Sequence, residues 1–302
     1  MSLRLGTRGS ALALAQSRLV AASLREAAPD LDVELVEIST AGDRSNAPVV
    51  SLGVGVFVSA LREALLAKEI DVAVHSYKDL PTAPADGLTL AAVPPREDPR
   101  DVLVARDGLT LAGLPAGARI GTGAVRRIAQ LSALGRGLVA VPIRGNVDTR
   151  LRKVADGELD AVVLARAGLL RLGRAAEVTE ILDPELMLPA PAQGALAIEC
   201  RSHDAERMQL LAAIDDPVTR AAVTAERALL AELEAGCSAP VAALAVLVGA
   251  EIHLRAAVFS LDGSFAVRAT RTGTPAEAEQ VGRSLAAALR AEGADTVLGV
   301  QQ

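Results

Sequence analysis

Residues 4–7 read Arg-Leu-Gly-Thr, and residues 119–122 read Arg-Ile-Gly-Thr. Each tetrapeptide has the pattern of a short strand that leads through a tight turn into a helix. Two further pairs follow in the same order: the apolar runs 33–38 and 138–143, and the hexapeptides Glu-Ile-Asp-Val-Ala-Val (69–74) and Glu-Leu-Asp-Ala-Val-Val (158–163). Because three pairs recur in order, we interpret the sequence as an internal duplication.

The alternation of strands and helices predicts an α/β fold. In the first repeat, Leu12, Ala15, Leu19 and Ala22 recur at helical spacing, and Ser10 stands where an N-cap is expected. Strands that alternate with helices predict mostly parallel sheets covered on both faces. Two similar lobes of this kind, with a cleft between them, resemble the type II periplasmic binding proteins.

Proline-rich segments and a change of pattern predict the domain boundaries. Residues 93–99 (Val-Pro-Pro-Arg-Glu-Asp-Pro) and 189–191 (Pro-Ala-Pro) are the expected crossings between lobes. After them come a helix that begins at Asp216-Pro217, strands at 241–248 and 251–259, and an amphipathic helix at 275–292. We therefore expect lobe 1 at 1–94 with 190–213, lobe 2 at 97–188, and a small C-terminal α+β domain at 216–302.

Composition argues against several classes of function. The formal net charge is −6 and the chain has only four aromatic residues, which disfavours binding to nucleic acid. No apolar stretch reaches membrane-spanning length, and the N-terminus does not resemble a signal peptide. The three histidines are scattered, so no metal site is expected. Two cysteines do not make a disulfide framework, and we expect them to stay reduced in the cytoplasm.

Polar residues gather in the loops that follow the repeated strands. In doubly wound sheets ligands bind outside the carboxyl ends of the strands. A single arginine is more often a solvated surface residue, by roughly three to one, but the shared placement favours a site for carboxylate or phosphate groups. The candidate binding residues are Arg8, Ser10, Lys78, Thr122, Arg126, Arg127, Arg144 and Arg150.

Three other features allow two interpretations each. Gly121-Thr122-Gly123 resembles half of a dinucleotide fingerprint, but Arg126 occupies the third glycine position, so we reject a dinucleotide cofactor. Asp79 either manages protons and positive charge or fixes the turn before Pro81. Cys237, in a loop between a helix and a strand, is either a reactive thiol or a small turn residue, whereas Cys200 ends an apolar strand and is expected to be buried and inert.

Motifs spread along nearly the whole chain resemble those of the hydroxymethylbilane synthase (porphobilinogen deaminase) family. They are Gly6–Ser10, Ala73–Pro81, Arg96–Asp101, Arg144-Gly145-Asn146, Gln193-Gly194-Ala195 and Glu234-Ala235-Gly236-Cys237. The resemblance implies a dipyrromethane cofactor in thioether linkage to Cys237, and stepwise condensation of four porphobilinogen molecules with loss of ammonia. It also implies a catalytic role for Asp79, adds Gln193 to the binding residues, and leads us to expect a cytoplasmic monomer.

The sequence departs from the family pattern at two places. Val54 stands where the family often has lysine, and Gly123-Ala124 stand where it often has two serines. We also expect residues 43–57 to form a mobile cover. The rival interpretation is a non-catalytic binding protein or the effector domain of a regulator, which would leave Cys237 and the third domain unexplained.

Overall fold

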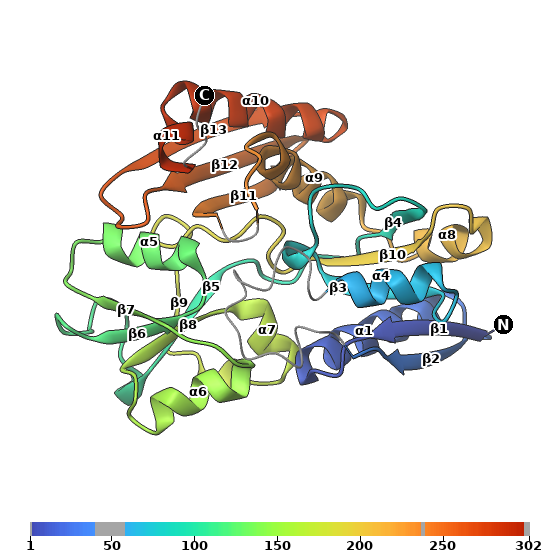
Figure 1. The fold of residues 1–302 in the computed structure, drawn as a ribbon, viewed down its shortest axis with the longest axis horizontal. Coiled ribbons are helices and arrows are strands. Elements are labelled where there is room, and N and C mark those ends of the chain that lie inside the picture. The colour runs from blue at the N-terminus through green and yellow to red at the C-terminus, as the bar shows by residue number, and fades with distance from the viewer. Residues whose placement is uncertain (1, 40–57, 237–238, 299–302) are drawn as a thin grey trace. The chain divides into compact units, whose positions relative to one another are not determined.

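The computed structural model describes residues 2–39, 58–236 and 239–298. The chain divides into two compact units. The first contains residues 1–97 and 195–220, and the second contains residues 98–194 and 221–302. Figure 1 shows the helices and strands of both units. Residues 43–57 and Cys237, for which the sequence predicts a cover and a cofactor attachment, lie outside the described residues.

The first unit is built on a five-stranded sheet in the order β2-β1-β3-β10-β4. Strand β1 pairs in parallel with β2 and β3, whereas β10 is antiparallel to both β3 and β4. The strands are β1 (Ser2–Thr7), β2 (Asp32–Glu37), β3 (Val72–Ser76), β4 (Leu88–Ala92) and β10 (Leu196–Arg201). The helices are α1 (Ala11–Ala27), α4 (Ser59–Leu66) and α8 (Ala205–Ala212), with a 3-10 turn, η1, at Tyr77–Asp79.

The second unit repeats this topology in the order β7-β6-β8-β5-β9. Here β6 is parallel to β7 and β8, and β5 is antiparallel to β8 and β9. The strands are β5 (Asp101–Ala105), β6 (Arg119–Thr122), β7 (Val139–Pro142), β8 (Ala161–Ala165) and β9 (Glu180–Ile181), and the helices are α5 (Val125–Ala133), α6 (Val147–Ala155) and α7 (Arg166–Arg171). The three predicted strand pairs are therefore confirmed as β1 and β6, β2 and β7, and β3 and β8.

One strand of each sheet runs against the other four. These strands are β10 and β5, and each follows a proline-containing segment that the sequence marks as a crossing. The other four strands of each sheet are parallel, as predicted. The prediction did not include an antiparallel strand in either sheet. An apolar run carries no information about strand direction, so periodicity could not reveal it.

The second unit also holds the predicted antiparallel α+β domain, except for the first four residues of its helix α9. Its sheet has the order β11-β12-β13, and both pairings are antiparallel. Its elements are α9 (Pro217–Glu232), β11 (Val241–Val248), β12 (Glu251–Phe259), β13 (Ala266–Gly273), α10 (Ala278–Ala291) and α11 (Ala294–Leu298). The expected strands at 241–248 and 251–259 agree with the structure at both ends, while β13 had not been expected.

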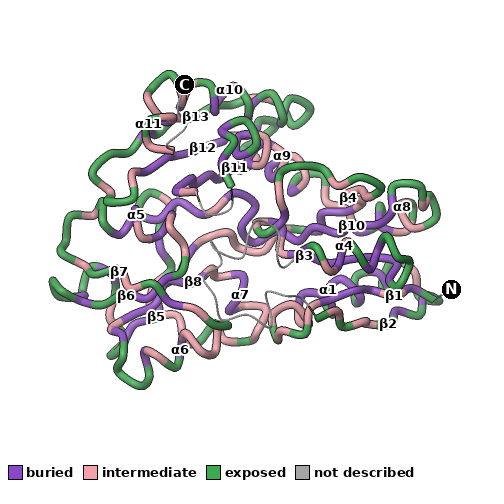
Figure 2. The backbone as a smooth tube through the Cα atoms, viewed as in Figure 1, coloured by how far each residue is buried: buried purple, intermediate pink, exposed green. Residues whose placement is uncertain are grey.

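Residues 241–245 of β11 and 256–259 of β12 are buried on both faces. Alternate residues, such as Leu254 and Val258, pack with residues of α9 and α10. The intervening ones, such as Leu244 and Phe259, pack with Ala129 of α5 and Leu188. Figure 2 shows these strands as largely buried. Two covered faces explain why residues 241–245 are continuously apolar instead of alternating, whereas Val246 and Val248 are exposed.

Helix ends follow the local signals in the sequence. The Ser10 hydroxyl accepts a hydrogen bond from the backbone N–H of Ala13, as predicted for an N-cap. The Asp216 carboxylate accepts from Thr219 N–H at 2.6 Å, at the start of α9. No helix among residues 2–39, 58–236 and 239–298 is long and apolar enough to cross a membrane.

Candidate functional site

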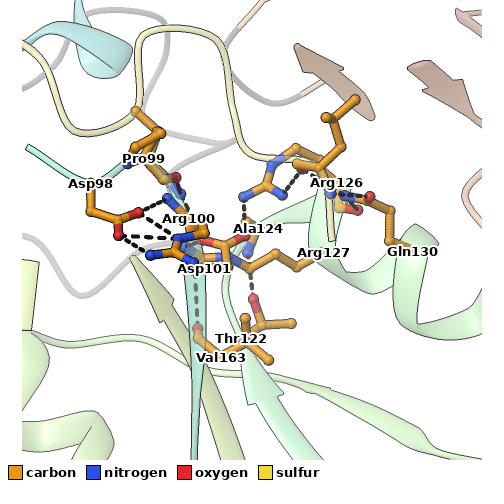
Figure 3. Close-up of polar contacts among 12 residues, drawn as sticks. Asp98, Pro99, Arg100, Asp101, Thr122, Ala124, Arg126, Arg127, Gln130 and Val163 are labelled. Atoms are coloured by element: carbon orange, nitrogen blue, oxygen red, sulfur yellow. Dashed lines mark hydrogen bonds and ion pairs between the residues drawn. The ribbon is translucent and has the colours of Figure 1, made fainter. Parts of the chain in front are cut away.

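The second unit has a cluster of buried charged residues where β6 ends and α5 begins (Figure 3). Strand β6 delivers Thr122, which is fully buried, and the Ala124 N–H donates to its hydroxyl at 3.3 Å. Helix α5 then places Arg126 and Arg127 in its first turn. The predicted turn from strand to helix therefore exists, and it directs two guanidinium groups into the interior.

Asp101 pairs with both of these arginines. Its Oδ2 lies 2.8 Å from Arg126 Nη2, and its Oδ1 lies 2.7 Å from Arg127 Nη2. Arg126 and Arg127 are each 4% exposed, and Asp101 is 0% exposed. These are ion pairs in a water-poor environment, where each charge interacts strongly with its neighbours.

Four further contacts fix the cluster to the surrounding backbone and to Gln193. Arg127 donates to the carbonyl of Val163 in β8 at 3.0 Å, and Arg126 donates to the carbonyl of Leu188. The Gln193 amide donates to Asp101 Oδ1 at 2.7 Å and to the carbonyl of Pro99 at 2.8 Å. The structure thus brings together four predicted binding residues, Thr122, Arg126, Arg127 and Gln193.

The electrostatics of the cluster leave an excess of positive charge. Burial alone would raise the pKa of Asp101, but Arg126 and Arg127 outweigh it and hold that pKa well below its usual range. Two guanidinium groups and one carboxylate sum to a charge of +1. Among the described residues, the buried Nε of Arg127 has no hydrogen-bond partner. Such a cluster can accept one anionic oxygen ligand.

Arg144 lies in the loop that precedes α6, and Arg150 lies in the first turn of that helix. Asn146 caps α6 by accepting from the Thr149 N–H at 2.9 Å, and Arg150 Nε donates to the Gly145 carbonyl at 2.9 Å. Arg144 is half-buried in the same loop. Arg150 is therefore held by the turn that begins α6.

The glycine at position 123 has a local structural reason. A Cβ atom there would lie 2.8 Å from the backbone carbonyl oxygen of Ile143. A serine in this backbone would therefore need a shift of the loop that precedes α6. The departure from the family pattern removes a hydroxyl group and at the same time permits this close approach.

The first unit holds the remaining predicted residues after β1 and β3. Ser10 caps α1, and Arg8 is half-buried. Lys78 and Asp79 lie in η1, directly after β3, with Lys78 half-buried and Asp79 exposed. Both loops lie at the carboxyl ends of parallel strands, as the sequence predicted.

Of the two cysteines, only Cys200 lies among the residues that the structure describes. Cys200 is fully buried in β10, and burial raises the pKa of its thiol to about 11, which agrees with the expectation of an inert side chain. Beside Cys237, the described residue Glu234 has a left-handed backbone with φ of 51°. Ala192, next to Gln193, has φ of 60°. Lys68 and Asp107 are the other described non-glycine residues with a left-handed backbone.

Asp101 is the residue of this cluster that sequence reasoning missed. It stands in the motif Arg96–Asp101, but no role was assigned to it. The rule that was applied looks at residues after strands, whereas Asp101 is the first residue of β5. Because β5 runs antiparallel, its beginning pairs with Ala165 at the end of β8. Asp101 therefore lies at the carboxyl ends of the parallel strands only because β5 runs in the opposite direction.

The fold and the cluster define a class: α/β proteins with two similar sheets, one of which carries two buried arginines paired with a carboxylate. Family models identify the chain more closely. Residues 3–209 match the porphobilinogen deaminase, dipyromethane cofactor binding domain, and residues 220–291 match the porphobilinogen deaminase C-terminal domain. The chain belongs to the porphobilinogen deaminase family, so the resemblance found in the sequence is confirmed.

Curated relatives agree with this assignment. The porphobilinogen deaminase of Nocardia farcinica is 58% identical over 305 residues, covering 98% of this chain and 88% of the relative. That of Mycobacterium tuberculosis strain H37Rv is 58% identical over 298 residues, covering 95% of each. The rival interpretation as a non-catalytic binding protein or regulator is therefore not supported.

Solved structures with a similar fold include binding proteins. The methionine binding protein MetQ has a TM-score of 0.44 at 14% identity, covering 70% of this chain and 88% of MetQ. A mutant Bordetella pertussis BvgS VFT2 domain has a TM-score of 0.40 at 19% identity, covering 70% of this chain and 86% of the domain.

Proposed function

We propose that this chain is a hydroxymethylbilane synthase that condenses four porphobilinogen molecules on a dipyrromethane primer and releases a linear tetrapyrrole. The observation that carries the proposal is the match to both porphobilinogen deaminase domains, over residues 3–209 and 220–291. The enzyme is a transferase of tetrapyrrole biosynthesis. The dipyrromethane, when bound, supplies the primer to which the pyrrole units are added.

The buried cluster fits a pyrrole carboxylate. Each pyrrole of this chemistry carries an acetate and a propionate group, and the cluster has a charge of +1 and a buried Arg127 Nε without a partner among the described residues. Thr122, Arg126, Arg127 and Gln193 would hold carboxylates in the second unit together with Arg144 and Arg150. Arg8, Ser10 and Lys78 would do so in the first. Cys237 would be the covalent attachment point and would hold the dipyrromethane through a thioether.

Asp79 is proposed as the catalytic carboxylate. Loss of ammonia from porphobilinogen leaves a positively charged pyrrole, and a fixed carboxylate stabilises such charge as it develops. Asp79 lies in η1, next to Lys78 and directly after β3, so the sheet fixes the backbone that carries it. The same carboxylate can hold the proton that must be removed when each new carbon–carbon bond has formed.

Intact-protein mass spectrometry tests the proposal. The active protein should exceed its sequence mass by two pyrrole units, and peptide mapping should place the addition on Cys237. Cys237→Ser should lose the added mass and the turnover of porphobilinogen. Cys200→Ser is the matched control and should keep both, because Cys200 is buried in β10. An active enzyme with an unmodified mass would contradict the attachment to Cys237. Equal loss of added mass and turnover in Cys237→Ser and Cys200→Ser, with both variants folded, would contradict it too.

We also propose that the enzyme works as a cytoplasmic monomer. Sedimentation of the purified chain at micromolar concentration should give a mass near 31.0 kDa plus the cofactor. A stable dimer at that concentration would rule out the monomer.

A further inference from the structure

Asp101 lies at the centre of the buried cluster, although it is itself no candidate for binding an anion. Its carboxylate is fully buried, and its two oxygens serve different partners. Oδ2 accepts from Arg126, while Oδ1 accepts from Arg127 and from Gln193. One carboxylate therefore connects three residues for which sequence and family imply contact with cofactor or substrate.

We propose that Asp101 is a positioning residue, which orients Arg126 and Arg127 toward one pyrrole carboxylate and limits the cluster to a single excess positive charge. This inference rests on the proposed function. It concerns how the site is prepared for the anion, because Asp101 itself would repel the bound carboxylate.

Each guanidinium group is fixed at two of its nitrogens. Arg126 is held by Asp101 through Nη2 and by the Leu188 carbonyl through Nη1. Arg127 is held by Asp101 through Nη2 and by the Val163 carbonyl at 3.0 Å through Nη1. Two contacts on a planar group fix its orientation as well as its position. Within the cluster, the Nε of Arg127 is then a buried donor that has no hydrogen-bond partner among the described residues.

The charge of Asp101 sets what the cluster can bind. Without it, Arg126 and Arg127, which are adjacent in sequence and buried, would repel each other and carry two uncompensated charges. With it, the remaining charge equals that of one carboxylate. Donors that are already oriented and that match the charge of the carboxylate can bind it without rearranging. If such a group is misplaced by about 1 Å, the rate of the catalysed reaction can fall by about 10²-fold.

Asp101→Asn is the first test, because the amide keeps the size of the side chain. Its single oxygen can accept from one arginine, and its NH₂ group must face the other. Mass spectrometry gives the fraction of molecules that carry the cofactor, and kcat and KM for porphobilinogen are then expressed per cofactor-bearing molecule. We expect kcat/KM to fall by about 10²-fold.

Asp160→Asn is the matched control. Asp160 also connects two arginine residues, since its Oδ1 lies 2.7 Å from Arg106 Nε and its Oδ2 accepts from the Arg119 N–H at 2.7 Å. It precedes β8, so it lies at the opposite end of that strand from the cluster. The control should keep the wild-type kcat/KM. If Asp101→Asn loses no more kcat/KM than Asp160→Asn, the positioning role is overturned.

Asp101→Glu separates position from charge and decides the question if the asparagine variant does not fold. It keeps the charge of −1 but moves the carboxylate by one methylene group. Positioning predicts a loss of at least about 10-fold in kcat/KM per cofactor-bearing molecule, and wild-type kcat/KM would overturn it. A wild-type protein that lacks the cofactor mass and does not use porphobilinogen would instead overturn the proposed function.

Discussion

Glu199 is a buried carboxylate of β10 in the first unit, and it shows how single residues pair charges in this protein. It is 4% exposed and accepts two hydrogen bonds from Arg62, at 2.8 and 3.0 Å. The Nε2 of His75 lies 3.2 Å from Glu199 Oε2, although it is not aligned for a hydrogen bond. His75 is therefore packed near the end of β3.

This pairing predicts a dependence of stability on pH. Burial alone would raise the pKa of Glu199, but His75 and Arg62 lower it from 4.5 to about 2. Because the folded pKa is depressed, the stabilisation is present above pH 4.5 and is lost as the pH falls toward 2. The difference corresponds to roughly 3 kcal/mol.

Urea unfolding between pH 6 and pH 2.5 checks this prediction. The free energy of unfolding should fall less steeply with acid in Glu199→Gln than in the wild type. Glu63→Gln removes an exposed carboxylate from the same helix as Arg62 and should keep the wild-type profile. If the free energy of unfolding falls equally with acid in the wild type and in Glu199→Gln, Glu199 does not contribute to the pH dependence of stability.

Asp79 gives the second prediction for a single residue. Asp79→Asn should fold and retain the cofactor mass, because Asp79 is exposed in η1. An amide cannot neutralise a cationic pyrrole, so kcat should fall by about 10²–10³. Turnover measured on material of known cofactor content checks this, and a near-normal kcat would remove Asp79 from the mechanism.

Among the elements, α5 packs against a hairpin of the C-terminal domain. Gly263, in the turn between β12 and β13, has φ of 74°. A Cβ atom there would lie 2.5 Å from Ala133 N and 2.6 Å from Ala129 O, both in α5. The turn therefore packs directly against the backbone of the helix that carries Arg126 and Arg127.

Gly263→Ala should disturb this contact. Gly249→Ala is the matched control, because Gly249 has φ of 62° but no atom within 4 Å of an added Cβ. The control should lose about 1–2 kcal/mol in the free energy of unfolding from backbone strain. Gly263→Ala should lose about 1–3 kcal/mol more from overpacking and should also lower activity. If both variants lose the same free energy of unfolding in denaturant, the turn does not stabilise α5.

At the scale of the molecule, the C-terminal sheet and the sheet that carries β6 belong to one compact unit. Phe259 is fully buried and packs in a cluster with Ala129 and Leu188. Phe259→Ala should cost about 3–5 kcal/mol in the free energy of unfolding. Hydrogen exchange should become faster in α5 as well as in β11 and β12. A loss of protection confined to β11–β13 would show that the two parts unfold independently.

The sequence by itself determined the duplication, the paired strands, the N-cap of α1 and the family. These features depend on local spacing and on motifs, because hydrophobic period, capping residues and turn residues act within a few positions of the chain. The arginines after β6 were predicted for the same reason, since strand ends can be found from an apolar run and the turn that follows it.

Only the tertiary structure decided which carboxylates pair with those arginines. Asp101 meets Arg126 and Arg127 because β5 runs against its neighbours, and no sequence pattern encodes strand direction. Likewise, Glu226 of α9 is fully buried and accepts the backbone N–H groups of Ala192 and Ala245, at 2.5 and 2.7 Å. Such partners lie tens of residues apart, and a buried charge is stable only where the fold brings its partners together.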